Sequence, residues 1–408
     1  MFRNKRGEPD VWAADSPASG TGLLQQPCGK STRPARPPDS ADPIAVTMSG
    51  GGFRATLPAV GVVRLLADLG MLPDLRYVSS VSGGSVANGM VAVRWPELRG
   101  RDFTSQAVDD LVVTPLVKRI SSSSLKLALI RGAWRTLGPR TRTDLLADQF
   151  DAWFFEGRRM ADLDPGVRWI VSAANQVSGV RFTFERDVLG DYTIGLIPTA
   201  ETGVKLSLAV AASAAVPGAF APVVLDQLTF PCATHPPALL DGGTYDNTGL
   251  EALDGEQYRQ TFLVVLNAGG LLRAGSYGKV PLVRDLARAN SLLYRQSTAL
   301  RTREMVGRFK RCPPGPVPEG ARRGVLFALA TDFPEPRPGK LAEWRERFPE
   351  HRTYKGADLA LVPTVFDKLD PVLCRALVYR GWWLAGAAMA AYHPDRVPSL
   401  GSIKAPAL

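Results

Sequence analysis

A serine stands where a short strand-like run breaks into glycines. The predicted strand at 75–81 (LRYVSSV) is followed by Ser82-Gly83-Gly84. The segment SVSGG at 80–84 fits the GxSxG nucleophile elbow, with Ser80 in place of the first glycine. The elbow is crowded and requires small residues on either side, and Ser80 and Gly84 meet that requirement. We therefore predict that Ser82 is the nucleophile of an acyl-transfer reaction.

A competing register exists in the same segment. GGSVA at 83–87 would make Ser85 the nucleophile, but Ser85 lies farther from the end of the strand-like run. A serine nucleophile needs a base, which is usually histidine. His235 lies in a Pro-rich loop, His351 in a charged segment and His393 just beyond the last predicted helix. We interpret all three as structural.

An aspartate offers the alternative base. The segment LLDGGTYDNTG at 239–249 places Asp241 at the end of an apolar run, before two glycines that allow close approach. Asp241 could hold and deprotonate Ser82 directly. The later pair Asp246-Asn247 is expected to shape the loop and to take no catalytic part.

Three consecutive glycines form the third signal. SGGGFR at 49–54 lies between a predicted strand and a predicted helix, so the amides of Gly50, Gly51 and Gly52 are candidates for binding negative charge. That charge could be a phosphate or the oxyanion of acyl transfer. The segment fits neither GxGxxG nor the P-loop.

These signals need strands and helices that bring them together. Strand patterns alternate with helix patterns, which favours a mostly parallel sheet covered by helices on both faces. The expected strands are 44–48, 75–81, 167–175, 180–185 and 262–270, and the expected helices include 53–69, 206–215, 283–309 and 377–392. The last of these is too short to span a bilayer, so we expect a packed helix.

Composition divides the chain into three parts. Residues 1–42 are Pro/Ser/Gly-rich and predict a disordered leader, 43–395 form one domain, and 396–408 form a tail. The four cysteines form no close pair, so we expect scattered reduced thiols in a cytoplasmic protein. The net charge of +10 could serve nucleic acid, an anionic membrane surface or solubility alone. No nucleic-acid-binding module is recognisable.

One basic segment suggests where a membrane could be touched. Residues 118–142 lack Asp and Glu and interleave cations with apolar side chains. The cations are Lys118, Arg119, Lys126, Arg131, Arg135, Arg140 and Arg142, and the apolar residues include Leu125, Leu127, Leu129, Ile130 and Trp134. A lid or peripheral contact with anionic lipid is one interpretation. A basic segment packed on the core is the other.

Together the motifs resemble the patatin-like phospholipases, in the branch near the cytosolic phospholipases A. The matching segments are SGGGFRA, SVSGGS, AASAAVPGAFAPV at 211–223, DGGTYDNTG, VPTVFDKL and LVYRGWW, in the family's order. The resemblance implies a three-layer α/β/α domain and a lipid acyl hydrolase of phospholipase A or lysophospholipase type. It also implies a Ser-Asp dyad, an acyl-serine intermediate, and neither cofactor nor catalytic metal.

Carried over to this chain, the resemblance makes Ser82 the nucleophile and Asp241 the base. Gly50, Gly51 and Gly52 would form the oxyanion hole, and Arg54 would bind the substrate phosphate. No calcium-dependent lipid-docking module is recognisable. An acyltransferase, or a catalytically silent scaffold of the same fold, remains an alternative, since an acyl-serine can be discharged by an alcohol as well as by water.

Overall fold

The protein is described here from a computed structural model. It describes residues 27–32, 34, 36–132, 136, 138–270, 281–333, 338–353 and 355–407, and the side chains of 281–290 are left out. Residues 1–26 of the predicted leader and residues 133–135 of the basic segment lie outside the described residues.

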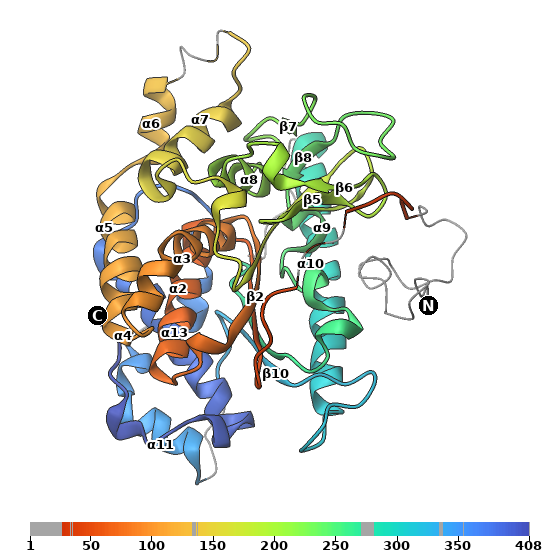
Figure 1. Cartoon of the computed structure of the whole chain (residues 1–408). Helices are drawn as coiled ribbons and strands as arrows, with labels where there is room; N and C mark the ends of the chain where they lie inside the picture. Colours follow the sequence, from red (N-terminus) through yellow and green to blue (C-terminus); the bar gives the residue numbers. More distant parts are fainter. Residues whose placement is uncertain are drawn as a thin grey trace.

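A ten-stranded sheet forms the centre of the molecule (Figure 1). Its main path runs β10-β9-β1-β2-β3-β4-β5-β6, and β8 also pairs with β3. The strands are β1 (Ile44–Met48), β2 (Leu75–Val81), β3 (Arg168–Asn175), β4 (Val180–Phe184), β5 (Val188–Asp191), β6 (Gly195–Pro198), β7 (Val223–Val224), β8 (Ala238–Asp241), β9 (Phe262–Asn267) and β10 (Gly324–Ala328). Neighbours from β10 to β3 are parallel, and the remaining pairs are antiparallel.

Helices cover both faces of this sheet. In β9, Val264 and Leu266 face the larger core, to which α2 and α13 contribute, whereas Leu263 and Val265 face a second core that contains Met305 of α10. Alternate strand residues point to opposite faces, so the sheet separates two helical layers. Figure 1 shows α2, α3 and α13 on one side and α9 and α10 on the other. The predicted three-layer α/β/α class is confirmed.

The helices follow the chain between and after the strands. They are α2 (Phe53–Asp68), α3 (Gly83–Gly100), α4 (Ser105–Val108), α5 (Thr114–Ser122), α6 (Leu125–Gly132), α7 (Arg142–Phe150), α8 (Leu206–Ser213), α9 (Gly243–Asp246), α10 (Pro281–Lys310), α11 (Lys340–Arg347), α12 (Gly356–Ala360) and α13 (Pro371–Tyr392). The predicted strands 44–48 and 75–81 match β1 and β2. The apolar run at 377–392 is confirmed as part of a packed helix, α13, because most of it is buried. No described helix is long and apolar enough to cross a membrane.

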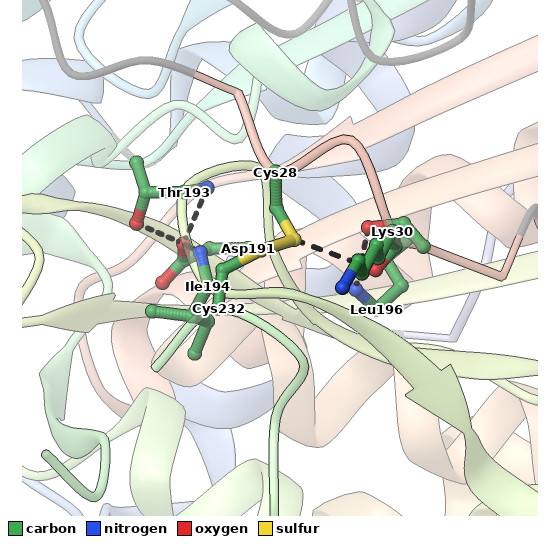
Figure 2. The surroundings of a disulfide bond; sticks show 8 residues. Cys28, Lys30, Asp191, Thr193, Ile194, Leu196 and Cys232 are labelled. Carbon is green, nitrogen blue, oxygen red and sulfur yellow. Dashed lines mark hydrogen bonds between the residues drawn. A yellow bond between two sulfur atoms is a disulfide. The ribbon is translucent and has the colours of Figure 1, made fainter. Parts of the chain in front are cut away.

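A disulfide joins Cys28 to Cys232 across the β5–β6 hairpin (Figure 2). The Cys28 amide donates to the Tyr192 carbonyl at 2.7 Å, and the Cys232 amide donates to the Ile194 carbonyl at 2.9 Å. Both cysteines are therefore hydrogen-bonded to the same turn, between β5 and β6 at the edge of the sheet. The expectation of four scattered reduced thiols is wrong for Cys28 and Cys232. These two residues are 204 positions apart in the sequence, and this separation did not indicate that the fold brings them together.

The end of the predicted leader is attached to the fold. The Thr32 amide donates to the Leu196 carbonyl at 3.2 Å, and Ser40 donates to Asp74 at 2.7 Å. The described residues between 28 and 42 therefore differ from the disordered leader predicted for 1–42. The segment predicted as a tail also packs, since Ile403 is fully buried.

We expect Cys28→Ser combined with Cys232→Ser to destabilise the protein by several kcal/mol. The disulfide closes a loop of 204 residues, and chain entropy assigns to such a loop a contribution of about 5 kcal/mol. Urea unfolding monitored by circular dichroism measures the change. Cys312→Ser is the matched control, because Cys312 forms no disulfide. Equal stability of the double variant and this control would contradict the prediction.

Candidate active site

Four of the predicted site residues, Gly51, Arg54, Ser82 and Asp241, line one cavity at the carboxyl ends of the parallel strands. Gly50 and Gly52 are not among the described residues that line it. The cavity has a volume of about 460 Å³. Gly51, Ser82 and Asp241 line it from the turns that follow β1, β2 and β8. Tyr294 of α10 and the segment 360–364 form further walls. Ligands bind at this edge of α/β sheets because the turns there leave a crevice.

Ser82 occupies a strained turn between β2 and α3. Its backbone φ of 51° lies in the left-handed region, which non-glycine residues rarely adopt. The turn is possible because Gly83 follows: a Cβ at Gly83 would lie 2.0 Å from the Gly52 carbonyl oxygen. The Ser82 amide donates to Ser213 Oγ at 2.8 Å. This is the geometry that a nucleophile elbow requires.

The competing nucleophile, Ser85, lies inside the protein. It is fully buried, and its hydroxyl lies 3.0 Å from both Ser80 Oγ and Ser213 Oγ. Ser80 in turn donates to the Ile170 carbonyl at 3.1 Å. The hydroxyl at the elbow's first position is thus satisfied, which explains why serine is accommodated where the pattern has glycine.

Asp241 ends β8 and lies beside Ser82. Its amide donates to the Ala215 carbonyl at 2.9 Å, and one carboxylate oxygen accepts the Gly243 amide at 2.7 Å. Burial raises the pKa of Asp241 to about 6, while hydrogen bonds from Ser82 and the Gly243 amide act in the opposite direction. A carboxylate with this pKa is ionised at neutral pH and basic enough to accept a proton.

The glycine run divides into one structural amide and two available amides. The Gly50 amide donates to the Asn247 carbonyl at 3.0 Å, so the prediction of Gly50 as an oxyanion-hole donor is wrong. Among the described residues, nothing accepts a hydrogen bond from the amides of Gly51 and Gly52. Gly52 has φ of 61° and immediately precedes α2. The two amides therefore lie at a helix N-terminus, where negative charge is favoured.

Arg54 brings a buried positive charge to the cavity. The residue is only 3% exposed, and burial lowers the pKa of its guanidinium. Nε donates to the Ala268 carbonyl at 3.2 Å, and a second nitrogen donates to the Val362 carbonyl. Within the described part of the chain Arg54 forms no ion pair with a carboxylate. Its charge is therefore available to an anionic ligand in the cavity.

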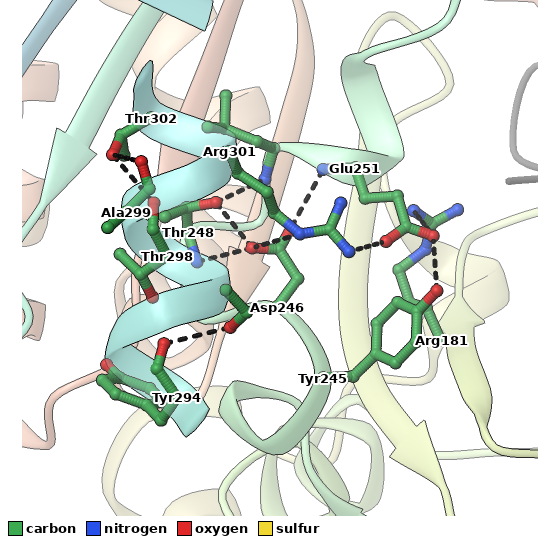
Figure 3. A network of polar contacts seen from close by, with 12 residues as sticks. Arg181, Tyr245, Asp246, Thr248, Glu251, Tyr294, Thr298, Ala299, Arg301 and Thr302 are labelled. Carbon is green, nitrogen blue, oxygen red and sulfur yellow. Dashed lines mark hydrogen bonds and ion pairs between the residues drawn. The ribbon is translucent and has the colours of Figure 1, made fainter. Parts of the chain in front are cut away.

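A polar network fixes the loop that follows Asp241 (Figure 3). Asp246 accepts the amides of Thr248 and Glu251, each at 2.9 Å. Arg301 of α10 donates to Glu251 at 2.5 Å, and Arg181 of β4 lies 3.7 Å from Glu251. The loop is thereby tied to both a strand and a helix, in line with the structural role predicted for Asp246.

Two further residues contribute to the site, Ser213 and Tyr294, and neither was predicted from the sequence. Ser213 accepts the Ser82 amide and donates to the Ser172 carbonyl at 2.6 Å, so it fixes the turn that bears Ser82. The signal was the run of small residues at 211–215, which permits this close approach. Tyr294 lies in the cavity wall near Arg54 and Asp241, and burial raises its pKa. No sequence pattern pointed to Tyr294.

The histidines lie away from the cavity. His351 stacks on Trp383 with ring centroids 4.2 Å apart, and His393 Nε2 lies 3.1 Å from the Gly324 carbonyl oxygen. His235 is exposed in the loop after Cys232. None of the three is among the described residues that line the cavity. No group of three or more potential metal ligands occurs in the described ranges.

Comparison with known proteins agrees with this fold. Residues 46–254 match the model of the family described as patatin-like phospholipase. The chain is similar to the structure of human GIVD cytosolic phospholipase A2, with a TM-score of 0.51 and 12% identity over 87% of this chain and 62% of that one. A complex of that human protein with methyl gamma-linolenyl fluorophosphonate gives a TM-score of 0.49 at 13% identity, over 87% and 59%. Curated protein sequences give no match.

The family model covers the strands and turns that carry Ser82 and Asp241. The chain therefore belongs to the patatin-like phospholipase family. The likeness to the human enzyme establishes the fold alone, and this chain spans less than two thirds of that protein's length. The family is one of lipid acyl hydrolases.

We expect Asp241→Asn to stabilise the protein above pH 6. The pKa of Asp241 is raised by folding from 3.8 to about 6, so folding favours the protonated form and the native state loses stability as pH rises through this interval. The neutral amide removes this loss, which is about 3 kcal/mol. Urea unfolding of both proteins at pH 4 and pH 8 measures it: the difference should be near zero at pH 4 and largest at pH 8.

The control for this prediction is Asp191→Asn. Asp191 is equally buried, but its carboxylate accepts five hydrogen bonds from described side chains and amides. This substitution should lower stability because the amide cannot accept all five. If Asp241→Asn lowers stability at pH 8 by as much as Asp191→Asn, the ionised carboxylate of Asp241 does not destabilise the native state, and the prediction is wrong.

Proposed function

We propose that the protein is a lipid acyl hydrolase that works through a Ser82–Asp241 dyad and an acyl-serine intermediate. The observation that carries the proposal is the strained backbone of Ser82, φ 51°, directly beside a buried carboxylate whose pKa is raised to about 6. Strain at a serine is costly and persists where the surrounding structure and the reaction require it. At the N-terminus of α2, the amides of Gly51 and Gly52, which donate to no acceptor among the described residues, complete the arrangement.

The first half of the reaction forms the acyl-enzyme. Ser82 Oγ attacks the ester carbonyl carbon while its proton passes to the Asp241 carboxylate. The carbonyl oxygen becomes an oxyanion bound by the amides of Gly51 and Gly52, and each such donor stabilises the transition state by about 2.7–4 kcal/mol. The intermediate then expels the alcohol, which takes the proton from Asp241.

The second half releases the fatty acid. A water molecule attacks the acyl-serine and gives its proton to Asp241, and the same two amides bind the new oxyanion. Collapse of this intermediate frees the fatty acid and returns the proton to Ser82 Oγ. Discharge by an alcohol in place of water would make the same site an acyltransferase.

The substrate we propose carries a phosphate near the ester, as in a phospholipid or lysophospholipid. Arg54 supports this choice because it is buried, lines the cavity, and within the described ranges donates hydrogen bonds to carbonyl oxygens and not to a carboxylate. An anionic group there supplies the missing counter-charge, and hydrogen bonds to a charged group contribute about 1.5–3 kcal/mol. Phosphate-bearing esters should therefore be preferred over neutral glycerides.

The cytoplasmic location expected from the sequence stays a proposal. The Cys28–Cys232 disulfide is the observation that bears on it, because disulfides persist mainly in oxidising compartments. Peptide mapping of the protein from its native cell, with thiols blocked at lysis, shows whether Cys28 and Cys232 are disulfide-bonded, as in an oxidising compartment, or reduced, as in the cytoplasm.

Fatty-acid release from mixed phospholipid and lysophospholipid vesicles tests the proposed function. We expect Ser82→Ala and Asp241→Asn each to reduce release at least a thousandfold, because each removes a group that forms or breaks a bond to the transferred proton. With the wild-type protein, release should fall at acidic pH with a midpoint near 6, where Asp241 becomes protonated.

The matched control is Ser85→Ala, which removes a hydroxyl three residues from Ser82 that lies outside the cavity. It should retain most of the activity. Loss of release with Ser85→Ala but not with Ser82→Ala would refute the assignment, and so would absence of release from folded wild-type protein at every pH tested.

A further inference from the structure

The α6–α7 segment is anchored on two loops that also line the cavity. At its start, Ser124 Oγ donates to Asp367 at 2.7 Å, three residues beyond Thr364 of the cavity wall. At the start of α7, Thr143 Oγ donates to the Ala221 carbonyl at 2.5 Å, in the loop that begins with the cavity residue Val216. The starts of α6 and α7 are therefore each tied to a loop that contributes residues to the cavity wall.

Figure 1 shows α6 and α7 at one end of the molecule, with α6 outermost, while α11 lies at the opposite end. One side of α6 packs inward: Leu125 is buried, and Leu129 packs against the main core. The other side is open. Its apolar residues Leu127 and Ile130 are 45% and 61% exposed.

The open side of α6 has an ordered pattern. At about 100° per residue, Lys126, Ile130, Leu127 and Arg131 follow one another around the helix within about 140°. The two apolar side chains occupy the middle of this face, and one cation lies at each border. Lys126 and Arg131 are exposed as well. We call these four residues the α6 face.

The exposed charges on α6 and on the end of α5 that precedes it are positive. The sequence contains no Asp or Glu from 111 to 143, and Lys118 and Arg119 of α5 are also exposed. Among the described residues, Asp367 accepts hydrogen bonds from Ser124 Oγ and the Lys126 amide at the start of α6. Asp148 of α7 forms an ion pair with Arg140 at 2.7 Å. An apolar strip bordered by cations suits a surface with anionic headgroups above acyl chains.

We propose that the α6 face docks the protein on an anionic lipid surface and so brings the cavity mouth to its substrate. The proposal deepens the proposed function and rests on it for the nature of the substrate. Of the two sequence interpretations of 118–142, the exposure of Leu127 and Ile130 favours lipid contact over a segment packed on the core.

Co-sedimentation with phosphatidylglycerol vesicles tests the proposal. The full chain is used with Ser82→Ala present throughout, so that no lipid is consumed. We expect Lys126→Glu with Arg131→Glu to weaken vesicle binding at least tenfold, since the change replaces two cations that attract the anionic surface with two anions that it repels. Leu127→Ser with Ile130→Ser should weaken it to a similar extent. Phosphatidylcholine vesicles should bind the unaltered face more weakly than phosphatidylglycerol vesicles.

Matched controls lie at the opposite end of the sheet. Arg347→Glu with Arg352→Glu changes the same charge on exposed residues in and just after α11. Tyr392→Ser removes a large side chain that is 67% exposed. The next residue, His393, contacts the carbonyl of Gly324, where β10 begins. Binding that is unchanged in both α6-face variants, or weakened equally by these controls, overturns the proposal.

The test separates this inference from the proposed function. The α6-face variants with Ser82 intact should hydrolyse a short soluble ester, such as p-nitrophenyl butyrate, at the wild-type rate. Failure of wild-type protein to hydrolyse any ester while vesicle binding follows the prediction would contradict the proposed function alone. Normal hydrolysis with vesicle binding unchanged in the α6-face variants would contradict the docking surface alone.

Discussion

The site depends on backbone segments that approach more closely than any side chain would permit. The turn after β2 meets the turn after β1, where a Cβ at Gly83 would lie 2.0 Å from the Gly52 carbonyl oxygen. The turn after β1 in turn meets the loop after β8, where a Cβ at Gly50 would lie 2.2 Å from Asn247 Oδ1. These contacts bring Ser82, Asp241 and the amides of Gly51 and Gly52 close together, and within the described part of the chain those two amides have no acceptor.

The same arrangement places unfavourable features beside favourable ones. Ser82 has a strained backbone. Asp241 is buried, and burial disfavours its ionised form and so raises its pKa. The surroundings offset these costs with hydrogen bonds to Ser213, Ala215 and Gly243. Local rules of stability are commonly broken at functional sites and compensated nearby. The clustering of both features in one cavity therefore supports catalysis better than either does alone.

Features that depend on neighbouring residues in the sequence, such as strand bounds and the turn at Ser82, could be predicted from the sequence. The strand-like runs at 44–48 and 75–81 are each followed by a serine and then by glycines, so their bounds and the position of Ser82 followed directly. The position of Asp241 before two glycines made it a candidate base, and the resemblance to a family supported that choice. Contacts that depend on packing could not be predicted: the contact of Ser213 with Ser82, the use of the Gly50 amide by Asn247, and the pairing of Cys28 with Cys232. Each joins segments that are far apart in the chain.

Covalent labelling by an alkyl fluorophosphonate tests the central claim most directly, because such a reagent phosphonylates a serine that has been activated as a nucleophile. The reaction is followed by mass spectrometry of peptides from wild-type protein and from Asp241→Asn, at pH 5 and pH 8. The dyad predicts one adduct, on Ser82, that forms faster at pH 8 and is absent from Asp241→Asn. An adduct on Ser85, or equal labelling of the two proteins, would contradict the account.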